Sequence, residues 1–148
     1  MSLKDRLSED MKDSMRARDS ARLESIRMLR AAIQRREVDA RLKLDDDGVL
    51  AVLQKQAKQH QDSIAQFEGG GREDLATKER EQLKVLQSYL PEQMDQAEVD
   101  QLIDEAMQET SAASMKDMGR VMALIKPKLQ GRADMGAVSS YIKARLQS

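Results

Sequence analysis

Residues 114–138 read S-M-K-D-M-G-R-V-M-A-L-I-K-P-K-L-Q-G-R-A-D-M-G-A-V and predict a helix, a basic turn and a second helix. Apolar residues recur at helical spacing between the cations, so one side of the first helix can be buried while the charges stay in water. Ser114 and Asp117 have the form of a capping box, and Asp134 suits the N-cap of the last helix. Pro127 is expected to stop or kink the first helix, and Gly131 to supply the turn.

The net charge of −1 hides a strong asymmetry around this stretch. Residues 92–113 contain seven acids and no base, whereas residues 114–148 contain seven bases and two acids, which gives −7 beside +5. Such segregation would attract a polyanion to one face of this part of the chain. Two alternatives stay open, because facing helices could pair these charges with each other, and many surface charges are simply solvated.

Upstream, apolar residues at spacings of three and four predict further helices. The first is expected to end near Arg18, and the second to be capped by Asp19 or Ser20. Asp45-Asp46-Asp47-Gly48 does not fit a calcium loop, because Lys43 and Gln54 would occupy its first and last ligand positions. We therefore expect Asp47 to cap the third helix.

The fourth helix is expected to begin at Glu73 or Asp74 and to end before Pro91, and a fifth begins with Asp95. No segment alternates with period two, and strand-forming residues are not enriched. The predicted fold class is all-α, with an N-terminal antiparallel bundle of about four helices over residues 1–91 and a small three-helix subdomain over residues 92–148.

The motif in residues 114–138 resembles the C-terminal signature of the GatB/YqeY family, in which S-M-K-D-M-G-x-V-M is followed by P-K-x-x-G-R-A-D. The likeness continues through residues 29–33, 71–75 and 89–91. It implies a small all-helical protein whose last third is similar to the tail domain of the B subunit of the glutamine-dependent Glu/Asp-tRNA amidotransferase, a domain that holds tRNA. Met135 and Gly136 stand where the family usually has Gly-Lys, so one expected cation is missing.

The first functional hypothesis is a tRNA-binding accessory module. Its candidate nucleic-acid contacts are Lys116, Arg120, Lys126, Lys128, Arg132 and Lys143. A secondary basic surface on the second helix comprises Arg22, Arg27, Arg30, Arg35 and Arg36, within a segment (residues 16–43) of net charge +5, although long Arg stems also cover apolar flanks. Binding through phosphates would depend steeply on salt and would read RNA shape, because Tyr141 is the one aromatic residue in the basic region.

The second hypothesis is an enzyme, because the family is associated with carbon–nitrogen ligases that use glutamine as amido-N-donor. The residues argue against intrinsic activity. The chain has no Cys, its one His (His60) lies on an apolar stripe as a hydrogen-bonded boundary residue, and Gly69-Gly70-Gly71 lacks the Lys and Ser/Thr of a phosphate loop. We predict no catalytic residue, no cofactor and no metal. A role in transamidation would consist of holding tRNA beside a catalytic protein partner such as an amidotransferase.

A third hypothesis is a protein-docking module. Met115, Met118, Met122 and Met135 could form an adaptable groove for a partner helix, or they could fill the core of the small subdomain. The absence of Cys, of an N-terminal apolar run and of a membrane-spanning segment predicts a cytoplasmic protein without a signal peptide. The oligomeric state is left open.

Overall fold

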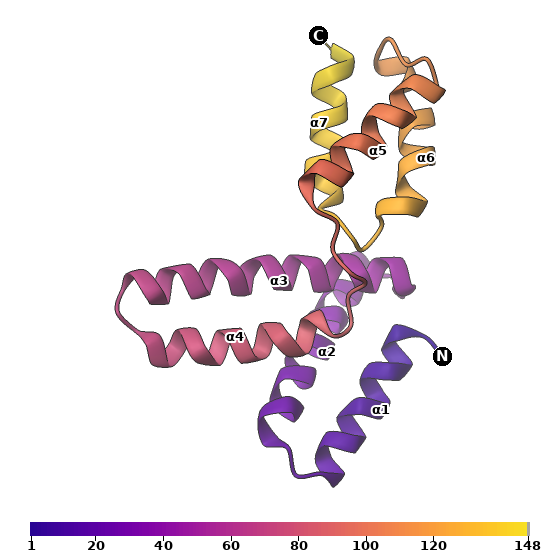
Figure 1. The fold of residues 1–148 in the computed structure, drawn as a ribbon. Coiled ribbons are helices and arrows are strands. Elements are labelled where there is room, and N and C mark those ends of the chain that lie inside the picture. The colour runs from indigo at the N-terminus through magenta and orange to yellow at the C-terminus, as the bar shows by residue number, and fades with distance from the viewer. Residues whose placement is uncertain (148) are drawn as a thin grey trace. The chain divides into compact units, whose positions relative to one another are not determined.

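The structure is a computed structural model that describes residues 1–147, and every regular element in that range is helical (Figure 1). It contains seven α-helices and one short 3-10 helix, and no strand forms among the described residues. The all-α prediction is confirmed. The chain divides into two compact units, Met1–Pro91 and Glu92–Ser148, here named the N-terminal unit and the C-terminal unit.

The N-terminal unit contains four helices, α1 (Leu3–Arg16), α2 (Ser20–Ala40), α3 (Asp46–Gly69) and α4 (Glu73–Gln87). Helices α3 and α4 lie side by side as a hairpin joined by the glycine-rich turn (Figure 1). The buried apolar residues of this unit form one cluster, which comprises Leu7, Ile26, Leu29, Ile33, Val49, Leu53, Ala57, Leu86 and Tyr89. His60 is also buried, and its Nδ1 shares a 2.5 Å hydrogen bond with Oε2 of Glu79 on α4. The expected hydrogen bond of this His is therefore present.

The C-terminal unit contains α5 (Gln96–Glu109), the 3-10 helix η1 (Met115–Asp117), α6 (Met118–Leu129) and α7 (Met135–Gln147). Each α-helix buries residues at spacings of three or four, so each presents one apolar side to a shared core. These core residues are Val99, Ile103 and Ala106 of α5, Val121, Ile125 and Leu129 of α6, and Val138, Ile142 and Leu146 of α7.

Most helix starts follow the local signals in the sequence. Asp19 accepts a hydrogen bond from the Arg22 amide at 3.1 Å, and Asp95 accepts one from the Glu98 amide at 2.8 Å. Asp134 accepts the amides of residues 136 and 137 at 3.0 and 3.2 Å. These carboxylates satisfy N–H groups that have no partner within the first turn of a helix.

The expected cap of α3 is wrong by two residues. Asp45, not Asp47, is the N-cap, and its Oδ1 accepts the Gly48 amide at 2.9 Å. Asp46 Oδ1 accepts the Leu3 amide at 2.9 Å, so this carboxylate serves the start of α1 instead. Three consecutive Asp residues can each cap a helix, and the long-range contact with Leu3 was not visible in the local pattern.

Pro127 lies inside α6, which continues to Leu129, two residues beyond it. A proline has no N–H to donate to the carbonyl four residues earlier, and α6 ends within one turn of it. Gly131 has a φ of 80°, the left-handed conformation expected of the residue that supplies the turn. Neither α6 nor any other described helix is both long and apolar enough to span a bilayer.

Candidate nucleic-acid interface

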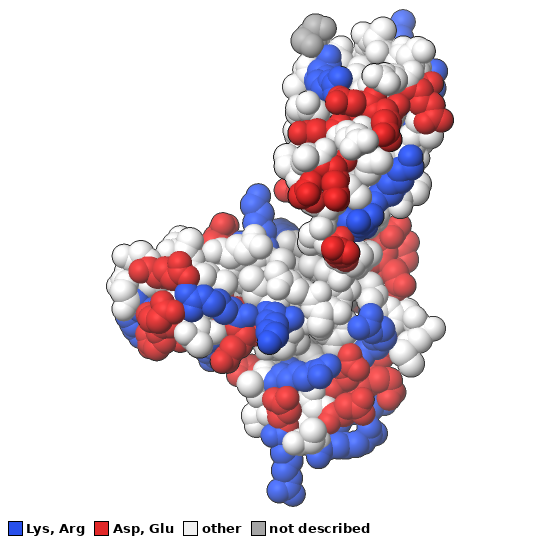
Figure 2. All heavy atoms as spheres, viewed as in Figure 1, with Lys and Arg blue, Asp and Glu red and all other residues white. Residues whose placement is uncertain are grey.

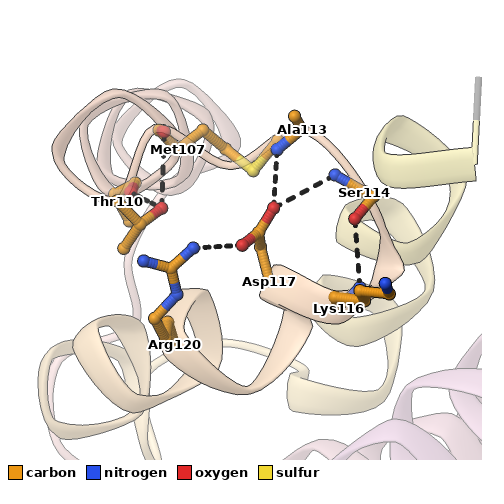
Figure 3. Close-up of polar contacts among 8 residues, drawn as sticks. Met107, Thr110, Ala113, Ser114, Lys116, Asp117 and Arg120 are labelled. Atoms are coloured by element: carbon orange, nitrogen blue, oxygen red, sulfur yellow. Dashed lines mark hydrogen bonds and ion pairs between the residues drawn. The ribbon is translucent and has the colours of Figure 1, made fainter.

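The candidate interface begins at a tightly hydrogen-bonded turn before α6 (Figure 3). The Asp117 carboxylate accepts the amides of Ala113 at 2.8 Å and Ser114 at 3.1 Å, and it forms an ion pair with Arg120. The Ser114 hydroxyl in turn accepts the Lys116 amide, which completes the predicted capping box. Backbone hydrogen bonds to Asp117, together with Arg120, lower the pKa of this carboxyl to about 2. The turn is thereby fixed, and it places Lys116 in η1 and Arg120 in the first turn of α6.

Four of the predicted contact residues display free ammonium groups. Lys116, Lys126, Lys128 and Lys143 are all exposed, and none forms an ion pair with another residue in the described part of the chain. Lys126 and Lys128 lie in the last turn of α6, where a cation also interacts favourably with the negative end of the helix dipole. These lysines can meet an external anion without breaking an internal salt bridge.

The cations of α6 do not form a single stripe. Arg120 and Lys128 are eight residues apart, two steps of four, and therefore lie on the same flank of the helix. Lys126 is two residues from Lys128 and points to the opposite flank, with the buried line through Ile125 between them. The last turn of α6 therefore presents positive charge to both sides.

Arg132 takes part in an internal contact of the C-terminal unit. Its side chain is half-buried, and its Nε donates a 3.0 Å hydrogen bond to the Glu92 carbonyl oxygen. The Arg132 carbonyl accepts the Met94 amide at 2.9 Å, and Gln93 Nε2 donates to the Gly131 carbonyl at 2.7 Å. The turn after α6 thus holds residues 92–94, and Arg132 is less available to a ligand than the four lysines.

Acidic side chains gather over α5 in the C-terminal unit (Figure 2). Asp104 of this helix forms an ion pair with Arg145 of α7, whose guanidinium also lies 5.7 Å from the centre of the Tyr141 ring. Arg145 is the one cation that an acid of α5 pairs with in the described range, and it was not among the predicted contacts. The acidic helix therefore does not neutralise the exposed lysines of α6.

A family model described as Yqey-like protein matches residues 4–146 of the chain. The chain belongs to the Yqey-like family.

Relatives of this Yqey-like chain carry the name "Altered inheritance of mitochondria protein 41, mitochondrial". The protein of that name from Pyrenophora tritici-repentis is 35% identical over 144 residues, which cover 96% of this chain and 77% of the relative. The one from Vanderwaltozyma polyspora is 31% identical over 76% of this chain and 64% of the relative, and the one from Kluyveromyces lactis is 38% identical over 56% and 45%. In the last two matches the chain spans less than two thirds of the relative's length.

The expected cytoplasmic location of the Yqey-like chain is contradicted by these names, each of which describes a mitochondrial protein. The expectation rested on the lack of Cys and of an apolar N-terminal run. Neither feature separates the cytoplasm from the interior of an organelle, because both compartments can hold a charged helical protein. The location therefore could not be obtained from composition.

The secondary basic surface of the Yqey-like chain lies on α2 and is only partly engaged. Arg22 lies 3.8 Å from Asp10, and Arg30 Nη1 contacts the Met11 sulfur at 2.9 Å. The remaining members, Arg27, Arg35 and Arg36, are exposed and form no ion pair within residues 1–147.

The methionines of the Yqey-like motif lie mainly in the core. Met118, Met122 and Met135 are partly buried and pack against the apolar cluster of the C-terminal unit, whereas Met115 is 40% exposed. This arrangement favours the core interpretation over a methionine-lined docking groove. Within residues 1–147 there is also no group of three or more His, Cys, Asp or Glu side chains that could hold a metal ion.

Sequence reasoning missed one polar contact of the Yqey-like fold. The Tyr89 hydroxyl donates a 2.5 Å hydrogen bond to Asp10, and Arg6 lies 5.0 Å from the centre of its ring. Burial and the bond to Asp10 raise the pKa of Tyr89 to about 12. The two residues are 79 positions apart, so no local pattern could have paired them.

Proposed function

We propose that this Yqey-like protein binds tRNA through the exposed lysines of its C-terminal unit. The observation that carries the proposal is that Lys116, Lys126, Lys128 and Lys143 are exposed and have no acidic partner within residues 1–147. Each ammonium group can neutralise one phosphate and release its condensed counterions. Because Lys126 and Lys128 diverge from one helical turn, they would contact phosphates on either side of the end of α6.

Recognition in this mode depends on RNA shape and charge. Tyr141 is 45% exposed but its ring is already covered in part by Arg145, so little aromatic surface is left for stacking on unpaired bases. We therefore expect similar affinities for different tRNAs and a steep dependence on salt.

The resemblance to the amidotransferase B-subunit tail supports a role linked to tRNA-dependent amide transfer. In this role the protein holds or delivers tRNA, and a partner enzyme supplies the chemistry. Glutamine hydrolysis needs an activated Ser or Cys, but the chain has no Cys, and its one His, His60, is buried in the N-terminal unit beside Glu79. Purified protein should therefore turn over neither glutamine nor ATP in the presence of Glu-tRNA, and turnover by the protein alone would contradict an accessory role.

Titration of total tRNA at low salt, repeated at increasing salt, tests the binding proposal. The double variant Lys126→Ala/Lys128→Ala should weaken binding and lower the salt slope by about one for each lost contact. Lys55→Ala/Lys58→Ala is the matched control, since it removes two exposed lysines of α3 and leaves the C-terminal unit intact. A wild-type protein that shows no binding at low salt, or equal losses in both variants, would contradict the proposal.

A further inference from the structure

The outer side of α2 carries apolar side chains that the N-terminal unit does not bury. The inner line of this helix, which includes Ile26 and Ile33, enters the core. On the outer side Met28 is 44% exposed and Val38 is 67% exposed, and Leu42, just beyond the helix, is 49% exposed. Large apolar side chains that gather along one helix, rather than scattering singly, indicate an interaction surface.

A groove of about 460 Å³ runs along the same helix. Its lining residues all come from α2 and are Ser20, Leu23, Glu24, Arg27, Met28 and Ala31. They span about three helical turns, or about 16 Å. The groove is shallow and open to solvent, and it follows α2 over that length.

Exposed arginine side chains lie among these apolar residues of α2. Four residues follow one another at a spacing of four and so share one side of α2, namely Leu23, Arg27, Ala31 and Arg35. Arg27 and Arg35 are exposed and have no acidic partner within residues 1–147. The acid that lines the groove, Glu24, already lies 3.7 Å from Lys78 of α4. The surface is therefore both apolar and positively charged.

We propose that this surface binds an acidic amphipathic helix of a partner protein. It is named the α2 groove face and comprises Leu23, Arg27, Met28, Ala31, Arg35 and Val38. Apolar side chains of the incoming helix enter the groove beside Leu23 and Ala31, and its carboxylates pair with Arg27 and Arg35. The unbranched thioether of Met28 can adapt to the shape of the side chain that it meets.

A second copy of this chain does not fit the α2 groove face. In a two-fold contact the face would meet itself, so two copies of Arg27 and Arg35 would face each other, and the acid that lines the groove, Glu24, already lies 3.7 Å from Lys78. A contact with another face would need exposed apolar residues beside unpaired acids. The other large apolar side chains exposed in the described range are spread over four separate places, namely Met1, Met15, Met115 and Tyr141.

RNA is also a poorer match than an acidic helix. Contacts with the sugar–phosphate backbone use cations and hydrogen-bond donors, and these could be supplied without an apolar groove. Binding RNA here would cover Met28 and Val38 with polar groups, so their burial would contribute little. A protein helix uses both the charge and the apolar surface. This inference concerns the N-terminal unit and does not depend on tRNA binding by the C-terminal unit.

Site-specific photo-crosslinking in the organism that makes the protein tests the class of partner. A photoreactive amino acid replaces Ala31, in the groove, and in a control chain it replaces Ala65, an exposed residue of α3. The expected result is a protein adduct at position 31 that is absent at position 65, with the crosslinked peptide sequenced by mass spectrometry and found to carry acids beside apolar residues at helical spacing. Adducts to RNA, adducts to a second copy of the chain, or no adduct above the control would overturn the proposal.

The captured segment is then synthesised as a peptide and titrated against the purified full chain. Arg27→Glu should weaken binding about tenfold, as expected for a lost charge pair at an interface, and replacing the facing acid of the peptide with Lys should restore it. Arg36→Glu is the matched control, because Arg36 is exposed on the same helix but lies about two and a half turns from Arg27, on the opposite side. Equal losses in the two variants, or no rescue by the charge-swapped peptide, would overturn the proposal.

Discussion

The two units present their cations in different surroundings. On α6 the apolar residues Val121, Ile125 and Leu129 are buried, so the lysines nearby face water without exposed apolar neighbours of comparable size. On α2 the arginines stand beside exposed Met28 and Val38. The longer stretches that contain these helices, residues 114–148 and 16–43, each carry a net charge of +5, yet a phosphate polymer uses charge alone, whereas a protein helix also uses the apolar surface. Equal charge therefore does not imply the same kind of partner.

The largest expected effect tests whether the two units are stabilised separately. Ile125 is 1% exposed in the core of the C-terminal unit, so Ile125→Ala should lower the free energy of unfolding of that unit by about 3 kcal/mol. Amide hydrogen exchange should report faster opening of α5, α6 and α7, with unchanged protection in α1–α4. A comparable loss of protection in both units would contradict separate stabilisation, because it would mean that the two units unfold together.

A smaller effect is expected from the polar contact within the N-terminal unit. Tyr89→Phe removes the hydrogen bond to the Asp10 carboxylate and should cost about 1.5–2 kcal/mol of unfolding free energy. Tyr141→Phe in the C-terminal unit is the control, and its exposed ring predicts a change within about 0.5 kcal/mol.

The buried hydroxyl of Tyr89 also predicts that the stability of the N-terminal unit falls at alkaline pH. The pKa of folded Tyr89 is raised to about 12, above its ordinary value of 10.0. The unfolded chain therefore loses this proton first, so the stabilisation is present below pH 10 and is lost as the pH rises toward 12. Tyr89→Phe should remove this part of the alkaline transition in denaturation followed by circular dichroism, and an unchanged transition would count against the buried hydrogen bond.

Replacing a methionine should lower the free energy of unfolding more in the C-terminal core than on the outer side of α2. Met122 packs against the C-terminal core, and Met122→Gln should lower stability by about 1 kcal/mol. Met28→Gln, on the outer side of α2, should change it by less than about 0.5 kcal/mol, because that side chain is already in contact with water. If the two variants were equally destabilised, α2 would be using Met28 for folding and the α2 groove face would lose its basis.

The smallest expected effect is on the stability of the C-terminal unit at acidic pH. Backbone amides and Arg120 lower the pKa of Asp117 to about 2, from an ordinary value of 3.8. The unfolded chain binds this proton first as the pH falls, so the contribution of Asp117 is complete above about pH 4 and is lost toward pH 2. Asp117→Asn should flatten the acid unfolding of the C-terminal unit in this window while leaving the N-terminal unit unchanged. An identical acid profile would contradict the hydrogen bonding shown in Figure 3.

Local signals predicted much of the fold because they act within one or two helical turns. The caps at Asp95 and Asp134, the box of Ser114 and Asp117, and the left-handed Gly131 each depend on residues at most four positions apart. The buried stripe of α5 followed equally from spacing alone.

Contacts between distant segments could not be predicted in the same way. Asp46 serves α1 rather than its own helix, and Arg132 holds the Glu92 carbonyl 40 residues away. The candidate interface was predicted as a set of cations, but the sequence did not show which of them would be engaged internally. Helix α2 was harder still, because its exposed apolar residues blur the periodicity that marks a buried side.

The most direct test of the proposed division between the units is a tRNA titration at several salt concentrations with two charge-matched variants. Lys126→Ala/Lys128→Ala and Arg27→Ala/Arg35→Ala each remove two exposed cations that have no acidic partner within residues 1–147. We predict that the lysine variant lowers the salt slope by about two and weakens binding, whereas the arginine variant binds tRNA like the wild type. Equal losses in both variants, or a loss confined to the arginine variant, would contradict this account.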